Sequence, residues 1–179
     1  MSFETAFQKV VMVEGGYSDH PSDTGGRTQF GITEAVARAH GYAGDMKDLP
    51  LGTAKALYKA QYWDTLHLDL IAAISEPIAH ELFDTGVNQG VGIAGFFLQR
   101  ALTALNRQGK DYPDLKADGV VGPMTISALR AYATRRGKDG ETVLLRLLNA
   151  QQGERYLSIT EGRAANEDFL FGWALRRLT

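Results

Sequence analysis

The chain has 179 residues and a mass of 19.6 kDa; 44% of its residues are hydrophobic and 22% are charged. This composition excludes intrinsic disorder, collagen-like repeats and coiled-coil fibres. Cysteine is absent, which excludes disulfides, thiol catalysis and thiolate metal sites. No apolar run approaches the ~20 residues of a membrane helix, and residues 1–9 lack the basic and apolar regions of a cleaved export signal.

Charge is distributed unevenly along the chain. Residues 1–90 hold 6 Lys/Arg and 12 Asp/Glu, a balance of −6, whereas residues 91–179 hold 13 and 9, a balance of +4. The basic half is too weakly charged to indicate nucleic-acid binding. We therefore expect no nucleic-acid partner and no membrane insertion.

The first predicted element is an amphipathic helix. Its apolar residues recur at steps of three and four, at Phe3, Ala6, Phe7, Val10 and Val11. This helix is expected to end at Gly15-Gly16. Residues 17–30 are polar and rich in glycine, and predict a long ordered loop or a small hairpin. Thr33 is the predicted N-cap of a short helix that runs to about Ala39.

Six further helices are expected after residue 50. Their approximate bounds are Thr53–Trp63, Pro77–Asn88, Ile93–Leu105, Thr125–Arg135, Glu141–Leu157 and Glu167–Leu178. Ser75 and Asn166 are the predicted N-caps of the second and the last of these. Residues 106–124 are polar and form a long connection. Because no alternating strand pattern occurs outside residues 17–30, the fold class is mainly α with a minor β element.

Glu14 is the first candidate for chemistry, in a stretch with five glycines in residues 13–33. It lies at the C-terminal end of the first predicted helix, where unpaired carbonyls disfavour an ionised carboxylate. Partial burial beside Tyr17 and Phe30 would act in the same direction, so we expect a raised pKa. A protonated carboxylic acid is what a departing glycosidic oxygen requires. The alternative is a solvated glutamate at a helix end.

Asp23 and Thr28 follow Glu14 along the same loop. If the loop folds back, Glu14 and Asp23 face each other across a cleft. A carboxyl separation of ~6.5–9.5 Å would favour inversion and ~5–5.5 Å a covalent route, and the sequence leaves both open. Thr28 can position the attacking water. The alternatives are an Asx-turn for Asp23 and an ordinary loop residue for Thr28.

These residues resemble a known family. Glu-Gly-Gly-Tyr at 14–17, Asp-x-Gly-Gly-x-Thr at 23–28 and Phe-Gly-Ile-Thr at 30–33 resemble the signature of glycoside hydrolase family 108. Its members are lysozyme-like N-acetylmuramidases of phages and prophages. The resemblance implies a lysozyme-like helical fold with a hairpin or loop near residues 17–32. It also implies cleavage of the β-1,4 bond between N-acetylmuramic acid and N-acetylglucosamine in peptidoglycan.

The resemblance assigns roles to individual residues. It implies Glu14 as the catalytic acid, Asp23 as base or electrostatic partner, and Thr28 as the residue that holds the water. Side chains expected to bind substrate through aromatic faces, carboxylates or amides are Tyr17, Tyr62, Trp63, Asp84, Asn88 and Gln89. A core position for Trp63 and a helix end for Asn88 and Gln89 are the alternatives. No cofactor and no metal is expected, since His20 beside two aspartates is more typical of a solvated loop.

The resemblance also divides the chain. Residues 1–95 are expected to form the muramidase region, and residues 96–179 a helical peptidoglycan-binding region packed on it. Asp118-Gly-Val-Val-Gly-Pro-Met-Thr125 resembles the loop-to-helix motif of that second region. From the local sequence alone, Gly122-Pro123 sets a tight turn, and this turn is a sufficient structural explanation of the motif.

Two rival functions remain open. A lytic transglycosylase would use the same glutamate but leave 1,6-anhydro products, and a wall-binding or secretion-associated protein would release no reducing ends. For the hydrolase we expect a monomeric endolysin, made in the host cytoplasm and acting on the wall after holin-type release.

Overall fold

The computed structural model describes residues 3–11, 16–17 and 27–178. The chain forms two compact units, residues 1–64 and 65–179, which we call the first and the second region. Helices dominate both, and the described strands form one two-stranded antiparallel sheet. The predicted class, mainly α and lysozyme-like with a small β-hairpin, is confirmed. None of the described helices combines the length and apolarity that a bilayer crossing requires.

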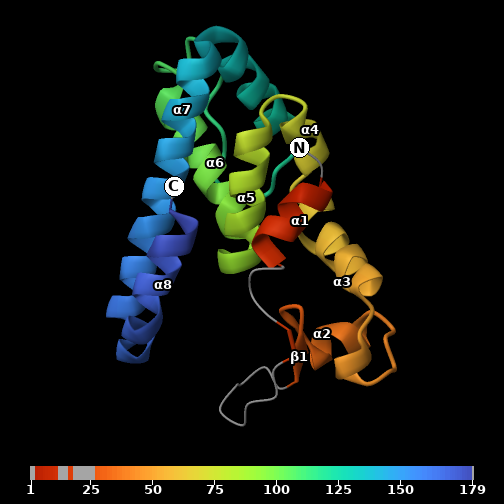
Figure 1. Ribbon diagram of the computed structural model, residues 1–179. Coiled ribbons are helices and arrows are strands. Elements are labelled where there is room, and N and C mark those ends of the chain that lie inside the picture. Colours follow the sequence, from red (N-terminus) through yellow and green to blue (C-terminus); the bar gives the residue numbers. More distant parts are fainter. Residues whose placement is uncertain (1–2, 12–15, 18–26, 179) are drawn as a thin grey trace. The chain divides into compact units, whose positions relative to one another are not determined.

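The first region consists of short elements (Figure 1). They are α1 (Phe3–Val11), β1 (Thr28–Gln29), β2 (Ile32–Thr33), α2 (Glu34–Ala39), the 3-10 turn η1 (Met46–Asp48), α3 (Leu51–Tyr58) and the π-helix η2 (Lys59–Asp64). Thr33 caps α2 as predicted, because its hydroxyl accepts a hydrogen bond from Val36 N at 3.4 Å. The predicted helix at 53–63 is present but changes to π geometry after Tyr58.

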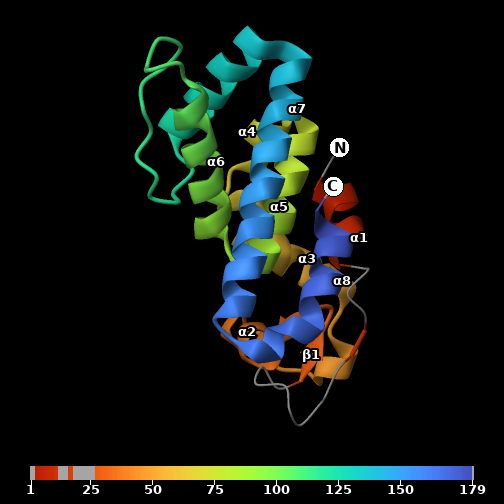
Figure 2. The same ribbon diagram turned by 90° about the vertical axis from the view of Figure 1, so that its left-hand side faces the viewer.

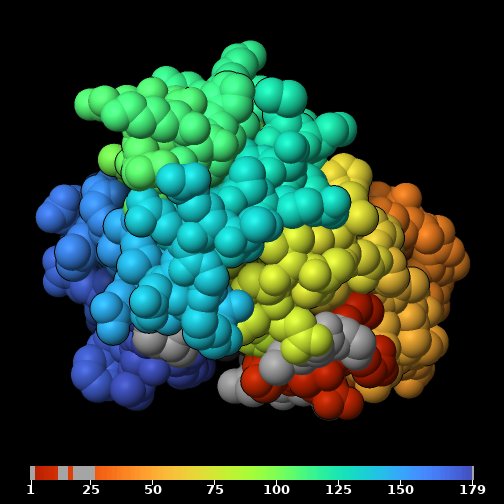
Figure 3. Space-filling model, turned by 90° about the horizontal axis from the view of Figure 1, so that it is seen from above, coloured from red at the N-terminus to blue at the C-terminus, as the bar shows by residue number. Residues whose placement is uncertain are grey.

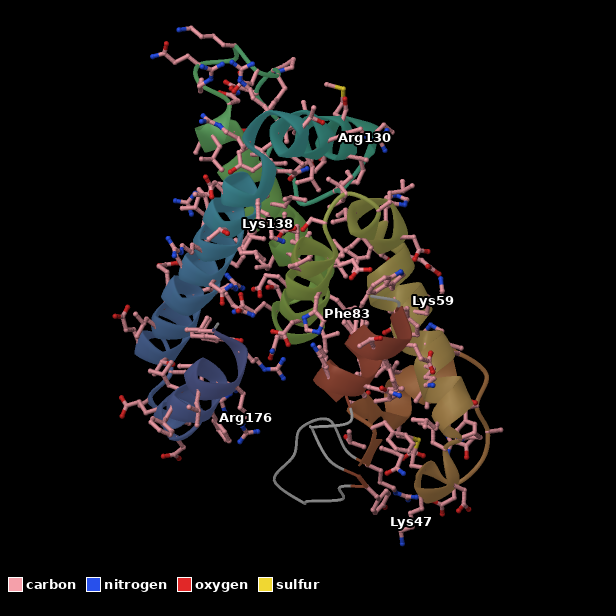
Figure 4. All side chains as sticks on the ribbon, turned by 45° about the horizontal axis from the view of Figure 1, so that its top comes forward. Lys47, Lys59, Phe83, Arg130, Lys138 and Arg176 are labelled. Atoms are coloured by element: carbon pink, nitrogen blue, oxygen red, sulfur yellow. The ribbon has the colours of Figure 1, made fainter. Side chains whose placement is uncertain are left out.

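The second region consists of longer helices. They are α4 (Leu68–Ala72), α5 (Glu76–Gln89), α6 (Val91–Leu105), α7 (Pro123–Glu161), the 3-10 turn η3 (Ala164–Asn166) and α8 (Glu167–Arg177). Helices α5, α6 and α7 run side by side, and α8 lies against α7 (Figure 2). Ser75 caps α5 as predicted, since its hydroxyl accepts from Ile78 N at 3.3 Å. Phe83, labelled in Figure 4, is fully buried in the middle of α5.

The connection after α6 is held by one buried glutamine. The Gln99 amide nitrogen donates to Asp118 Oδ1 at 3.1 Å, to Val120 O at 2.9 Å and to Thr125 Oγ1 at 3.3 Å. Its amide oxygen accepts from Gly119 N at 2.8 Å. The connection therefore lies against α6 and the start of α7, in green and teal in Figure 3. Asp118, the first residue of the predicted wall-binding motif, therefore has a structural hydrogen-bond partner in Gln99.

Helix α7 is interrupted where two helices were expected to separate. Gly137 has φ 56° and ψ −141°, which is not helical, and the helix continues after it to Glu161. The hydroxyl of Tyr132 donates to Gly140 O at 2.9 Å across the bend. Helix α8 begins after Asn166 as predicted, but the Asn166 side chain makes no capping hydrogen bond to α8. Its amide nitrogen instead donates to Ile159 O at 2.9 Å, which closes the turn between α7 and α8.

Candidate active site

The predicted catalytic residues fall largely on the stretch before the hairpin. Glu14 and Asp23 lie outside the described residues, so their roles stay predictions. Thr28 is described: it begins β1, is half-buried and pairs with Thr33 across the sheet. Its expected role in holding the water also stays a prediction.

The hairpin that carries Thr28 is anchored at its turn. Phe30 and Gly31 form a two-residue turn in which both φ angles are positive, 51° and 73°, as in type I′ hairpins. The hydroxyl of Tyr58 on α3 donates to Phe30 O at 3.1 Å. At the other end, Glu34 N donates to Arg27 O at 2.8 Å. Both ends of the hairpin are thus tied to neighbouring helices, which fixes the backbone on which Thr28 sits.

A row of aromatic rings joins α1, α3 and η2. Ring centroids are 5.8 Å apart for Phe3 and Phe7, 5.5 Å for Phe7 and Tyr58, and 5.3 Å for Tyr58 and Tyr62. Trp63 meets Phe3 edge-on at 5.5 Å and is 2% exposed. Such a contact is typical of core packing. Stacking of Trp63 on the substrate stays a prediction, and only the sequence supports it.

Tyr62 and Tyr17 are the more accessible of the predicted aromatic residues. Tyr62 is half-buried, and burial raises the pKa of its phenol. It lies on a π-helix, a rare geometry that often occurs at functional sites. Tyr17 is also half-buried, and Lys47 Nζ lies 5.2 Å from the centroid of its ring. Both rings therefore keep some surface for a ligand.

The remaining predicted residues, on α5, belong to a buried polar network. Asp84 Oδ1 accepts from Arg177 Nη1 at 2.6 Å, and Asp84 Oδ2 accepts from Gln152 Nε2 at 3.2 Å. Gln89 Nε2 donates to Gln152 O at 3.4 Å. With the Asn88 amide oriented to suit its neighbours, its oxygen accepts from Arg177 Nε at 2.5 Å, from Nη2 at 3.2 Å and also from Nη1. Helices α7 and α8 therefore contact all three predicted residues of α5.

Burial perturbs the two carboxyl groups of this network. The pKa of Asp84 is raised by desolvation, which outweighs the opposing effects of Arg177, Gln152 and His80. Glu81, one turn earlier on α5, is 7% exposed, and burial together with the nearby Asp84 raises its pKa to about 7. Hydrogen bonds from Asn149 and Thr85 act in the opposite direction. Glu81 thus keeps a proton over most of the acidic range.

Glu81, Gln152 and Arg177 were missed by the sequence reasoning. A signal for Glu81 was available, since Glu81, Thr85 and Asn88 follow the i, i+4, i+7 spacing of one helix face. No local signal identifies Arg177, because 93 residues separate it from Asp84. No group of three or more His, Asp or Glu side chains that could hold a metal ion occurs among the described residues.

Comparisons with known proteins agree with the family resemblance seen in the sequence motifs. Residues 7–90 match the family model "Glycosyl hydrolase 108", and residues 93–178 match the model "Predicted Peptidoglycan domain". The solved structure of Brucella abortus SagA is similar, with 26% identity and a TM-score of 0.69 over 97% of this chain and 88% of that chain. A search among curated protein sequences gave no match.

The two family matches together cover nearly the whole chain. They support a glycoside hydrolase whose substrate is peptidoglycan. The resemblance inferred from the first 33 residues is therefore confirmed: residues 7–90 of this chain belong to the glycosyl hydrolase 108 family, and residues 93–178 to the predicted peptidoglycan domain family.

Proposed function

We propose that this protein is an N-acetylmuramidase that hydrolyses the β-1,4 bond between N-acetylmuramic acid and N-acetylglucosamine in peptidoglycan. The observation that carries the proposal is the match of residues 7–90 to the glycosyl hydrolase family. That stretch contains Glu14, Asp23 and Thr28, the three residues to which the family resemblance assigns the chemistry. The peptidoglycan domain match over residues 93–178 supports the polymer as substrate.

In this proposal the three residues share the chemistry of bond cleavage. Glu14 donates its proton to the glycosidic oxygen as the bond to the departing sugar breaks. Asp23 stabilises the positive charge that develops on the remaining sugar ring, or takes a proton from the attacking water. The hydroxyl of Thr28 orients that water. The anchored hairpin holds Thr28 in place. Tyr17, Tyr62 and the polar residues of α5 contact the glycan.

Product analysis tests the reaction. Purified peptidoglycan is digested, the new ends are reduced with borohydride, and the fragments are identified by mass spectrometry. We expect reduced muramic acid at the new ends, which is the product of muramidase hydrolysis. A reduced glucosamine end would contradict the proposed bond. Fragments lighter by one water, with a 1,6-anhydro ring, would instead indicate a lytic transglycosylase.

The catalytic acid is tested separately. Glu14→Gln removes the proton donor while keeping the shape of the side chain, so we expect no fragment release at an unchanged melting temperature. A well-folded Glu14→Gln that still cleaves would remove Glu14 from the mechanism. Wild-type protein that binds peptidoglycan and releases no fragments would indicate the wall-binding alternative.

We also propose that the enzyme acts as a phage or prophage endolysin, made in the host cytoplasm as a monomer and released to the wall by a holin. The family resemblance supports this role. Expression in a bacterial host with and without a co-expressed holin tests it. We expect lysis only with the holin; lysis at equal rates in both strains would contradict the release route.

A further inference from the structure

Arg177 connects two stretches of the chain that match different families. It is the last residue of α8, within the peptidoglycan domain match, and its partners Asp84 and Asn88 lie within the hydrolase match. The ion pair is largely buried: the side chain of Arg177 is 9% exposed and that of Asp84 13%. All three residues belong to the second region.

Packing alone gives no reason for a charged pair at this position. Moving two charges out of water costs free energy that their attraction recovers only in part, so a buried ion pair is weak evidence for stability. Apolar side chains would join α8 to α5 at least as well. The guanidinium differs from an apolar side chain because its donors lie in one plane. They therefore restrict the orientation of the groups that accept hydrogen bonds from it.

The acceptors are fixed on one face of α5. Asp84 and Asn88 are four residues apart, so they are neighbours on the helix surface. Gln152 holds the second oxygen of Asp84 at 3.2 Å, and the Asn88 amide oxygen faces the guanidinium. With its oxygen engaged, the amide group of Asn88 must direct its N–H donors away from Arg177. Asn88 is half-buried, so part of its side chain is accessible to a ligand.

We propose that Arg177 is a positioning residue that makes Asn88 a hydrogen-bond donor toward the acetamido carbonyl of the glycan. Helix α8 thereby completes a substrate-binding site whose contact residues lie on α5. A guanidinium can only donate, so it orients the amide in one sense. This inference rests on the proposed function and names the substrate group that Asn88 recognises.

The experiment compares four variants on two substrates. Arg177→Met removes the donors, Arg177→Lys keeps the charge without the planar fork, and Asn88→Asp keeps an acceptor for Arg177 but has no N–H to donate. Arg176→Met is the matched control, because Arg176 is the exposed neighbour on α8, labelled in Figure 4. The substrates are soluble glycan strands with their acetyl groups and the same strands after chemical de-N-acetylation.

On acetylated strands we expect Arg177→Met and Asn88→Asp to raise KM about tenfold, since a charge-assisted network is lost or the donor is removed, with a smaller change in kcat. Arg177→Lys should recover part of the loss, and Arg176→Met should match the wild type. On de-N-acetylated strands, Arg177→Met should bind no more weakly than the wild type, because the recognised carbonyl is gone. A merely structural role would weaken binding to both substrates equally.

Three results would overturn the inference: a wild-type KM in folded Arg177→Met, equal losses on both substrates, or full activity of Asn88→Asp. If Arg177→Met does not fold, Asn88→Asp and Arg177→Lys decide the same question by their substrate dependence. Absence of any cleavage by the wild type would refute the proposed function itself, and the positioning role with it. Product analysis of the wild type therefore separates the two failures.

Discussion

The two regions of the chain bury different kinds of side chain. In the described part of the first region, the buried residues are apolar or aromatic, and the ion pairs, such as Lys59 with Asp64, are at least partly exposed. The second region contains all nine buried polar residues found among the described positions: Ser75, Glu81, Thr85, Gln99, Asn106, Thr125, Asn149, Gln152 and Thr160. Apolar packing tolerates many geometries, whereas buried hydrogen bonds are satisfied in few.

This contrast indicates a division of tasks. In the first region the elements are short, and the burial of large aromatic rings stabilises their packing. In the second region, long helices already bury apolar residues such as Leu98 and Leu129, so polar groups can define the register between them. The following substitutions test that division, from the largest expected effect to the smallest.

Phe7→Ala tests the aromatic row of the first region. Phe7 is fully buried and contacts the rings of Phe3 and Tyr58. Its removal should lower the free energy of unfolding by about 3–5 kcal/mol, because a large cavity remains. Denaturant unfolding measures the loss. Phe171→Ala is the control, since Phe171 is 78% exposed and should change stability by less than about 0.5 kcal/mol. Equal effects of the two would contradict the proposed dependence on ring packing.

Glu81→Gln tests the buried polar network through pH. The ordinary pKa of 4.5 applies when the chain is unfolded, and the folded value is about 7. Between these values the folded protein keeps a proton that the unfolded chain has lost, so stability falls as pH rises from 4.5 to 7. The total loss is on the order of 3 kcal/mol.

Glutamine resembles the protonated acid and does not ionise. Glu81→Gln should therefore match the wild type near pH 4 and be more stable above pH 7. Urea unfolding at several pH values measures both. Part of the slope should persist in the variant, because the pKa of Asp84 is raised as well. An identical pH dependence of the two proteins would show that Glu81 is not the titrating group.

Gln99→Ala tests whether one side chain holds the long connection. The substitution leaves Gly119 N and Val120 O without the partners that Gln99 provides. We expect a loss of about 2–3 kcal/mol and faster amide exchange at residues 118–121. Gln8→Ala is the same change at an exposed position of the first region and should be nearly neutral. Slow exchange at residues 118–121 in Gln99→Ala would contradict the assigned role.

Removal of a helix cap should cost nearly the same stability in the two regions. Thr33→Ala and Ser75→Ala each remove a cap, at a cost of about 1 kcal/mol. Ser75→Ala should cost somewhat more, because the Ser75 hydroxyl also donates to Glu141 Oε2 at 2.6 Å. Thermal unfolding of the two variants side by side measures the difference. A larger loss for Thr33→Ala would reverse the expected order.

Local signals in the sequence predicted most of the helices. The apolar steps of α1 and α6, the caps at Thr33 and Ser75, and the interruption near Gly137 each depend on residues close in the chain. Asn166 is the N-cap residue of α8 as predicted, but its amide bonds to Ile159 O in the preceding helix and not to α8. A tertiary partner thus replaced the local one that the pattern suggested.

The candidate site was less accessible to sequence reasoning. A sequence motif predicts Asp84, Asn88 and Gln89, but their partners Gln152 and Arg177 lie 68 and 93 residues away from Asp84. The burial of Glu81 was equally hidden, since a glutamate on a helix is ordinarily solvated. Distant pairing of this kind depends on how the helices pack, and local periodicity does not encode it.

The bend at Gly137 makes a single residue decide the path of the longest helical segment. The pair φ 56° and ψ −141° is accessible to glycine and almost closed to residues with a Cβ atom. With alanine there, the 39 residues of α7 would favour one straight rod of about 58 Å. Glycine therefore avoids the strain that this bend would impose on a residue with a Cβ atom, and residues 123–136 keep their own path.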